Sequence, residues 1–517
     1  MKNKVQLITY ANSLGNNLND LGKILKEDLG DKIGGVHILP FYPSSSDRGF
    51  SPLTHFEVDS DFGDWEDVRK ISKEYDLVVD LIFNHISRES KIFQDYLKNG
   101  ENSKYKDYFI NSAKFSRLID GNKFKGIKHK IINFIGRIVN FFRRIDKIFH
   151  LNGVNRFILK RVYRPRKGSP FDVFRFCNGK KIVLWCTFSN DQIDLDLNNR
   201  QVREMIFKIM NKMSEVGVSL VRLDAVGYVI KKRGTSSFMI SETYDFISLL
   251  GERAHSKRLK VLPEVHNHYS VQLKLAHQKN VDYVYDFCLP PLVLHSIFKK
   301  NFRKLKKWIN IRPDNQITVL DTHDGIGIVD VEDFLSKKET NSLVKRIYSN
   351  GGNIALRASG ENSSNVDIYQ INSTFFSALG ESEEKYLIAR AIQFFVPGIP
   401  QVYYVGWLAG ANDEEKLKRT KIGRDVNRHN YSLEEVGKER KRKVVKRLEA
   451  LMHLRSNYPA FNGIFDVKNT LKGQLEMEWS EGESVCNLFV DMEKNLAVIK
   501  YRCEETGRIK KWNFVKV

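Results

Sequence analysis

Eight short apolar runs of strand length recur along the chain, most of them separated by helix-like patterns. β-Branched and aliphatic residues dominate these runs, as is typical of strands buried on both faces of a parallel sheet. Eight such strands alternating with helices predict an α/β fold, a (β/α)8 TIM barrel. The runs lie at residues 5–10, 35–40, 77–83, 218–223, 259–262, 283–287, 317–320 and 400–405.

Two gaps between the runs are too long for simple barrel connections. The gap after the third run predicts an inserted domain at 85–197, and the gap after the seventh predicts a second insertion at 326–386. We expect the barrel to occupy 1–84, 198–325 and 387–458. Beyond 458 the helical periodicity is lost and strand-like stretches follow, so we expect a small C-terminal β domain at 459–517.

The composition is that of a globular protein, with 42% apolar residues, 33 Phe and 20 Tyr. The net charge of +22 is spread along the chain without a nucleic-acid-binding motif, so we expect a solvated basic surface and no nucleic-acid partner. Five cysteines without CxxC spacing favour reduced thiols. With no stretch typical of a signal peptide or a membrane span, we expect a cytoplasmic location.

One basic amphipathic segment at 113–160 departs from this even spread of charge. Between 123 and 166 only Asp146 is acidic, against many Lys and Arg residues. We interpret it as a helix packed over the barrel mouth, with contact to an anionic membrane surface or a partner protein as the alternative. Its apolar residues fall at spacings of three and four: Ile127, Ile131, Ile135, Ile138, Phe142, Ile145 and Phe149.

Carboxylates follow three of the predicted strands, at the end where a barrel places its active site. They are Asp224, Glu264 and Asp324. Arg222, two residues before Asp224, allows two interpretations: a structural ion pair, or a guanidinium that keeps a nucleophilic carboxylate charged. Three carboxylates at three strand ends favour the second, because retaining glycosyl transfer needs a nucleophile and an acid/base and gains from a fixed anion.

Histidines lie beside these carboxylates and are candidates for binding sugar hydroxyls. They are His85, His266 and His323. No HExxH or comparable ligand spacing is present, so we expect no metal. The chain also lacks a Walker A loop, a GxGxxG after a strand and a GxSxG elbow, so we expect no nucleotide-dependent or serine-hydrolase chemistry and no cofactor.

Several strings resemble those of the sucrose phosphorylase family in the α-amylase superfamily (glycoside hydrolase family 13), over nearly the full length. The DIYQINS and GRDVNRH strings are the more specific to the phosphorylase branch. The strings are GVHILPF at 35–41, VRLDAVGY at 221–228, VLDTHDGIG at 319–327, DIYQINS at 367–373, QVYYVG at 401–406 and GRDVNRH at 423–429.

The resemblance implies Asp224 as nucleophile, Glu264 as acid/base and Asp324 as transition-state stabiliser, with Arg222 orienting Asp224 and lowering its pKa. It implies that a glucosyl unit is bound by Asp47, Phe50, His85, His323 and Arg424. It implies an acceptor side that includes the second insertion and is lined by Gln192, Tyr228, Asp367, Tyr369 and Gln370. It assigns phosphate binding to Arg166 and Tyr369, in agreement with the preference of phosphate for guanidinium and hydroxyl donors.

The implied activity is conversion of sucrose and inorganic phosphate to α-D-glucose 1-phosphate and D-fructose through a covalent glucosyl-enzyme. Sucrose 6-phosphate, glucosylglycerate and glucosylglycerol phosphorylases and a sucrose hydrolase are the alternatives within the family. A carbohydrate-binding protein or a membrane-surface protein on the same fold are the non-enzymatic alternatives. The oligomeric state is open, with a homodimer as one option.

Overall fold

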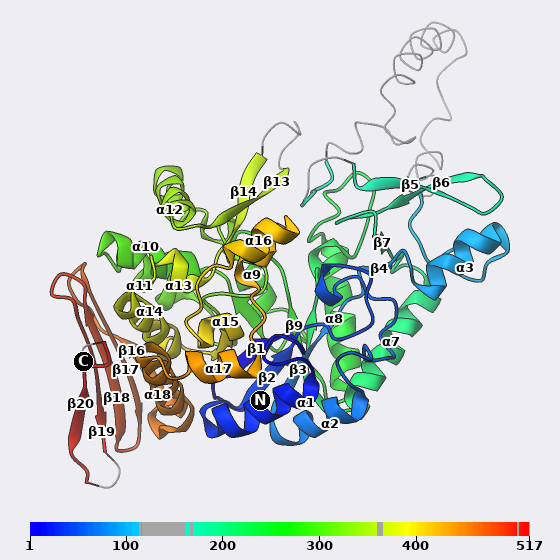
Figure 1. Cartoon of the computed structure of the whole chain (residues 1–517). Helices are drawn as coiled ribbons and strands as arrows, with labels where there is room; N and C mark the ends of the chain where they lie inside the picture. Colours follow the sequence, from blue (N-terminus) through cyan, green and yellow to red (C-terminus); the bar gives the residue numbers. More distant parts are fainter. Residues whose placement is uncertain (113–114, 116–160, 166–168, 359–365, 504–505, 516–517) are drawn as a thin grey trace, which may run out of the picture.

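The computed structural model describes residues 1–112, 115, 161–165, 169–358, 366–503 and 506–515, with only the backbone of 354–358 and 366–369. Its centre is an eight-stranded parallel sheet, of which Figure 1 labels β1, β2, β3 and β9. The strand order is β10-β11-β15-β1-β2-β3-β8-β9. The strands are β1 (Gln6–Thr9), β2 (Gly35–Ile38), β3 (Asp76–Leu81), β8 (Val218–Leu223), β9 (Lys260–Pro263), β10 (Val284–Asp286), β11 (Gln316–Thr318) and β15 (Ile399–Tyr403).

The two edges of this sheet approach each other and nearly close a barrel. The amides of Asp282 and Tyr283, just before β10, donate to the carbonyl of Val261 in β9 at 3.3 and 3.2 Å. Each of the eight runs identified in the sequence supplies one strand, so the predicted (β/α)8 barrel is confirmed.

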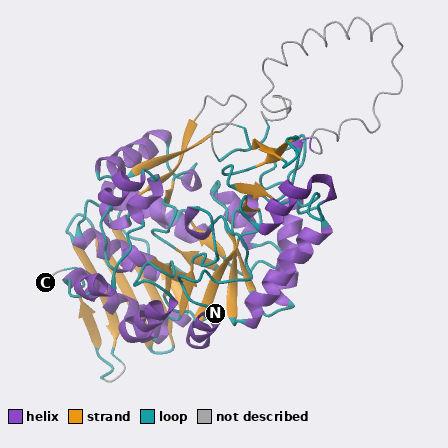
Figure 2. Ribbon diagram, turned by 45° about the vertical axis from the view of Figure 1, so that its right-hand side comes forward, coloured by secondary structure: helices purple, strands orange, loops and turns teal. Residues whose placement is uncertain are grey.

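Helices follow most of the strands and surround the sheet (Figure 2). In α2 the side chain of Asp64 caps the first turn, and Val68 and Ile71 are buried, so local capping and one apolar stripe explain where this helix begins and which face packs inward. The helices are α1 (Leu18–Lys23), α2 (Trp65–Glu74), α7 (Arg200–Glu215), α8 (Ser241–His255), α9 (Tyr269–Ala276), α10 (Leu289–Lys299), α11 (Arg303–Ile311), α13 (Phe375–Ala378), α14 (Glu383–Phe395), α15 (Tyr404–Trp407), α16 (Glu414–Thr420), α17 (Leu433–Glu439) and α18 (Lys443–Asn457).

The segment between β3 and β8 forms small antiparallel pairs at one side of the barrel mouth. These are β4 (His85–Ser87) with β7 (Gln192–Asp194) and β5 (Phe171–Arg175) with β6 (Lys181–Trp185), beside α3 (Lys91–Asn99). The predicted basic amphipathic segment lies outside the described residues, apart from its beginning. Phe115 is buried there, with its ring 4.9 Å from that of Trp185.

Two further antiparallel sheets follow later in the chain. The second insertion contributes α12 (Lys337–Ser349) and a sheet in the order β12-β14-β13, made of β12 (Ile326–Gly327), β13 (Asn353–Ala358) and β14 (Val366–Asn372). The C-terminal sheet runs in sequence order through β16 (Ile464–Val467), β17 (Gln474–Glu481), β18 (Ser484–Asp491), β19 (Leu496–Arg502) and β20 (Ile509–Trp512).

The C-terminal sheet packs on α14, whose side chains are nearly all buried, and the indole of Trp479 donates to the carbonyl of Phe395 at 2.7 Å. The architecture predicted for the insertions and the C-terminal β domain is confirmed, while their residue boundaries stay predictions. In the described part of the chain, no helix combines the length and apolar character needed to traverse a bilayer.

Candidate active site

A cavity of about 810 Å³ opens at the carboxyl ends of the barrel strands. Residues that follow β2, β3, β8, β9 and β11 line it, which is the end where this architecture carries its chemistry. The structure brings together twelve of the residues predicted from the sequence: Asp47, Phe50, His85, Gln192, Asp224, Tyr228, Glu264, His266, His323, Asp324, Gln370 and Arg424.

Arg222 lies on β8 and joins two carboxylates beneath this cavity. Its Nη1 donates to Asp224 Oδ1 at 2.9 Å and also to Asp80 Oδ1 on β3. Asp80 is completely buried and pairs through its other oxygen with His37 Nε2 at 2.8 Å. The predicted ion pair between Arg222 and Asp224 is therefore present, as part of a larger buried network that satisfies each charge.

Arg222 does lower the pKa of Asp224, as expected, but the net shift of that pKa is upward. Burial raises the pKa of Asp224 well above its ordinary value, and the negative charges of Glu264, Asp80 and Asp324 raise it further. Arg222 only opposes this rise, because its guanidinium also serves Asp80.

Glu264 follows β9 and reaches the same cavity from the next strand. Its Oε2 accepts a hydrogen bond from the amide of Ala225 at 3.0 Å, and its Oε1 lies 3.7 Å from His266 Nε2. Ala225 adopts a left-handed conformation with φ of 50°, which turns the chain sharply after Asp224. The two carboxyl groups are thereby held by the ends of adjacent strands, as the pairing of β8 with β9 requires.

Asp324 lies in the loop after β11 and is surrounded by positive charge. Its Oδ1 lies 3.1 Å from Arg424 Nη1 and 3.8 Å from Arg428 Nη2, and its Oδ2 lies 3.5 Å from His323 Nε2. Burial alone would raise the pKa of Asp324, but His323 and the guanidinium groups hold it far below its ordinary value. Asp324 is therefore a fixed anion at neutral pH.

The loop after β2 supplies one wall of the cavity. The ring of Phe50 stacks on His323 with centroids 4.9 Å apart, and its carbonyl accepts hydrogen bonds from His85 Nε2 at 2.8 Å and Gln192 Nε2 at 3.0 Å. Asp47, three residues earlier, lies 3.5 Å from Arg424. One loop thus contacts the segments after β3 and β11, the strand β7 and the turn at 423–427.

Other lining residues lie in the insertions or beside them. Tyr228 packs between Phe188 and Phe238, with ring centroids 5.2 and 4.7 Å away, and Gln370 on β14 is buried at the cavity wall. Arg166 and the side chains of Asp367 and Tyr369 lie outside the described residues, so their predicted roles stay predictions.

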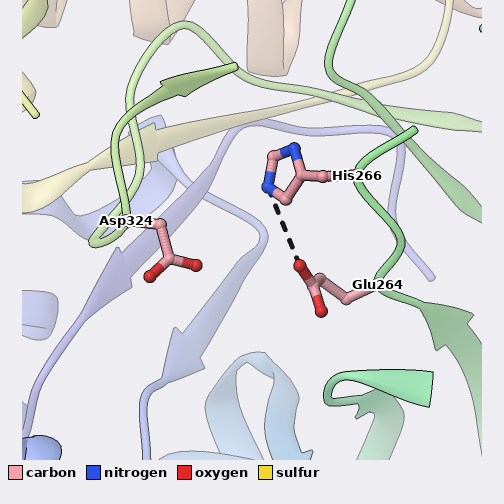
Figure 3. A group of neighbouring side chains, drawn as sticks. All are labelled: Glu264, His266 and Asp324. Atoms are coloured by element: carbon pink, nitrogen blue, oxygen red, sulfur yellow. Dashed lines mark ion pairs between the residues drawn. The ribbon is translucent and has the colours of Figure 1, made fainter. Parts of the chain in front are cut away.

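Glu264, His266 and Asp324 also form a group whose donor atoms all lie within 4.8 Å of one another (Figure 3). Guanidinium groups already stand beside both carboxylates, with Arg222 at 3.9 Å from Glu264 and Arg424 at 3.1 Å from Asp324. His266 Nδ1 contacts Asp330 at 3.2 Å. A divalent cation would meet these positive charges at close range, so the donor set does not fit a metal, whose absence stays a prediction.

Comparison with known proteins agrees with this geometry. A family model described as "Alpha amylase, catalytic domain" matches residues 25–287. A sucrose phosphorylase of Streptococcus mutans is 41% identical over 477 residues, which are 92% of this chain and 90% of that protein. The chain belongs to the alpha-amylase family.

Within the alpha-amylase family, the similar proteins carry different substrate names. A glucosylglycerol phosphorylase of Marinobacter adhaerens is 39% identical and covers 98% of both chains. The crystal structure of sucrose 6F-phosphate phosphorylase from Thermoanaerobacter thermosaccharolyticum superimposes with a TM-score of 0.89 at 39% identity, covering 99% of this chain and 98% of that one. The chain is therefore a phosphorylase of the alpha-amylase family, and an enzyme.

The residues that the sequence prediction missed at this site or beside it include Arg428, Asp80 and Lys231. Arg428 is buried and lies 3.7 Å from Asp47; it stands in the same GRDVNRH string as Arg424, so that string held the signal. Asp80 is a charged residue inside an apolar run, and this position was a signal that it has a structural or functional role. Lys231 binds Asn84 Oδ1 at 2.7 Å and also pairs with Asp194, residues too distant in sequence to suggest the contact.

Proposed function

We propose that the chain is a retaining phosphorylase that converts sucrose and inorganic phosphate to α-D-glucose 1-phosphate and D-fructose. The observation that carries the proposal is the convergence of Asp224, Glu264 and Asp324 on one cavity, from the ends of three barrel strands. Similarity to a named sucrose phosphorylase across most of the chain adds support. Each carboxyl group then has one role in a double displacement.

In the first half-reaction Asp224 attacks the anomeric carbon while the bond to the fructosyl oxygen breaks. Glu264 gives its proton to that oxygen, fructose leaves, and a β-glucosyl ester of Asp224 remains. Arg222 contacts Asp224 at 2.9 Å but Glu264 only at 3.9 Å, so it favours placing the negative charge on Asp224.

In the second half-reaction an oxygen of phosphate attacks the anomeric carbon and displaces the Asp224 carboxylate. Glu264 takes back a proton from the incoming phosphate, and α-glucose 1-phosphate forms with retained configuration. Asp324, held anionic by its guanidinium neighbours, stabilises the positive charge that develops on the sugar in both steps. We propose Arg166 and Tyr369 as the phosphate ligands.

The glucosyl unit is proposed to occupy the end of the cavity built on the loop after β2. Asp47 and Arg424 bind its far hydroxyl groups, and Phe50 covers its apolar face. His85 and His323 are fully buried, and burial lowers the pKa of each, so both are neutral hydrogen-bonding partners at physiological pH. Gln192, Tyr228, Asp367 and Gln370 are proposed to contact the fructosyl group or its replacement.

The deciding experiment incubates the protein with phosphate and each of four donors and measures glucose 1-phosphate. The donors are sucrose, sucrose 6F-phosphate, glucosylglycerol and glucosylglycerate. Sucrose is expected to give the highest kcat/KM. Sucrose 6F-phosphate is the second candidate, because an enzyme named for it superimposes over nearly the whole chain. Absence of product from every donor would overturn the proposal.

The five cysteines all lie among the described residues and none is paired, which supports a reducing compartment. We accordingly propose a cytoplasmic location. Fractionation of the source cells tests this location, and we expect the protein in the cytoplasmic fraction and not in the secreted fraction.

A further inference from the structure

One oxygen of Asp191 gathers three serine hydroxyl groups at the rim of the cavity. Asp191 Oδ2 accepts from Ser45 and Ser51, each at 2.7 Å, and from Ser46. Ser45 Oγ also lies 2.6 Å from Ser87 Oγ on β4. We call Asp191 and the three serines that bind its oxygen the serine clasp. It joins the loop after β2 to the segment that leads into β7.

The loop held by the clasp carries two residues of the proposed glucosyl site, Asp47 and Phe50. Its middle adopts an unfavourable backbone conformation, with φ of 51° at Asp47, 50° at Arg48 and 101° at Gly49. Non-glycine residues rarely populate this left-handed region, so the backbone itself does not favour the observed shape. External contacts must therefore hold the loop, and the clasp supplies three of them on one atom.

The clasp is suited to this task by its charge and its burial. Ser51 is fully buried and Ser45 and Asp191 are partly buried, so the hydrogen bonds from Ser45 and Ser51 are partly shielded from competition with water. Burial alone would raise the pKa of Asp191, but the three hydroxyl groups and Arg88 lower it. The carboxylate is thus charged at neutral pH, and hydrogen bonds to a charged acceptor are the stronger kind.

We propose that Asp191 is a positioning residue, whose carboxylate fixes the loop that presents Asp47 and Phe50 to the glucosyl unit. The inference rests on the proposed function for the identity of the sugar. Asp191 does not line the cavity and acts only through the loop. Its loss therefore weakens glucosyl binding, while the protonation of the leaving group by Glu264 and the binding of phosphate stay as they are.

The test measures binding of a glucose-configured iminosugar by calorimetry, together with kinetics on α-D-glucosyl fluoride and phosphate. For Asp191→Ala we expect the Kd of the iminosugar and the KM of glucosyl fluoride to rise together by about 10-fold to 100-fold, as small displacements of binding groups produce. The KM of phosphate is expected to stay within about 2-fold. Asp191→Asn is expected to recover part of the loss, since its carbonyl oxygen accepts hydrogen bonds without the charge.

A matched control is Asp95→Ala on α3. Asp95 also accepts from a serine, Ser103, at 2.5 Å, but it does not line the cavity and contacts none of the clasp residues. It is expected to leave both constants unchanged. Ser45→Ala removes one of the three hydroxyl groups at a residue that does not line the cavity, and it is expected to raise Kd and KM by about 2-fold to 3-fold, which keeps the test open if Asp191→Ala does not fold.

A folded Asp191→Ala protein with unchanged Kd and KM would overturn the inference, as would a loss confined to kcat or to the KM of phosphate. If the unmodified protein turns over none of the donors but binds the iminosugar, and Asp191→Ala weakens that binding, the positioning role stands and the proposed function fails. If the unmodified protein neither binds the iminosugar nor reacts, both fail.

Discussion

The proposed glucosyl and acceptor ends of the cavity are built from different parts of the chain. At the glucosyl end, barrel-strand ends and the turn at 423–427 hold one another through ion pairs, such as Arg424 with Asp324 at 3.1 Å and with Asp47 at 3.5 Å. At the acceptor end, Tyr228 and Gln370 stand beside segments that belong to the insertions. Relatives of similar sequence identity are named for different glucosyl donors, which fits a glucosyl end that they share and an acceptor end that varies.

The variant with the largest expected effect tests the proposed acid/base role of Glu264 at the glucosyl end. Glu264→Gln cannot protonate the fructosyl oxygen, so kcat/KM for sucrose phosphorolysis is expected to fall on the order of 10³-fold to 10⁴-fold. With α-D-glucosyl fluoride the loss is expected to be far smaller, because fluoride leaves without a proton. Steady-state glucose 1-phosphate production measures both. Sucrose phosphorolysis near the normal rate would remove Glu264 from its assigned role.

A second variant tests whether the glucosyl end is common to every donor. Arg424→Ala removes a charged donor and leaves Arg428 as the guanidinium beside Asp47 and Asp324, at 3.7 and 3.8 Å, so kcat/KM is expected to fall about 100-fold. The factor is expected to be equal for sucrose, for glucosyl fluoride and for any other accepted donor. Arg419→Ala, an exposed arginine on the neighbouring helix α16, is the control and is expected to change nothing. Unequal factors would show that the two ends are not separate.

The opposite pattern is expected at the acceptor end. Gln370→Ala is expected to change the ratio of kcat/KM between two accepted donors by about 10-fold, since a buried amide contributes hydrogen bonds of about 1 kcal/mol each. Glucosyl fluoride, which lacks an acceptor group of comparable size, is expected to change by less than about 3-fold. Gln201→Ala, at an exposed site on α7, is the control. A uniform loss across donors would contradict this assignment of Gln370.

The sequence predicted the glucosyl end better than the acceptor end, for a physical reason. Strand-end residues such as Asp224 and Glu264 follow apolar runs directly, so their position in the fold can be inferred from periodicity. The family resemblance then implied the roles of Asp47 and Arg424. Tyr228 follows β8 closely, but Gln192 and Gln370 lie in long insertions, where periodicity is weak and the distance to the barrel in sequence is large.

Networks between distant segments were not predictable at either end. The cluster formed by Asp191 with Ser45 and Ser51 joins residues separated by 140 positions or more, and no local pattern indicates it. The net upward shift of the Asp224 pKa was not predictable for a related reason. The sequence showed Arg222 beside it but not the burial or Asp80, which takes part of the charge of Arg222.

The smallest expected effect is a shift in the pH dependence of kcat/KM, which differs in direction between a variant beneath Asp224 and a variant at the glucosyl end. Burial and neighbouring carboxylates raise the pKa of Asp224, so the acid limb of kcat/KM, which reports ionisation of the free enzyme, is expected above the ordinary aspartate pKa of about 3.9. Asp80→Asn removes a negative charge and frees Arg222 for Asp224. Both changes favour the ionised form, so the limb is expected to move to lower pH, by about one unit or less.

Arg424→Ala removes a positive charge instead, which disfavours ionisation of Asp224, so its limb is expected to move slightly the other way, to higher pH. Profiles of kcat/KM on glucosyl fluoride, with thermal melting to confirm folding, measure both shifts. Because Arg424 contacts Asp47 and Asp324 rather than Asp224, its shift is expected to be the smaller of the two. Shifts of the same sign would mean that the limb does not report Asp224, and that the nucleophile is not the group whose ionisation limits the reaction at acid pH.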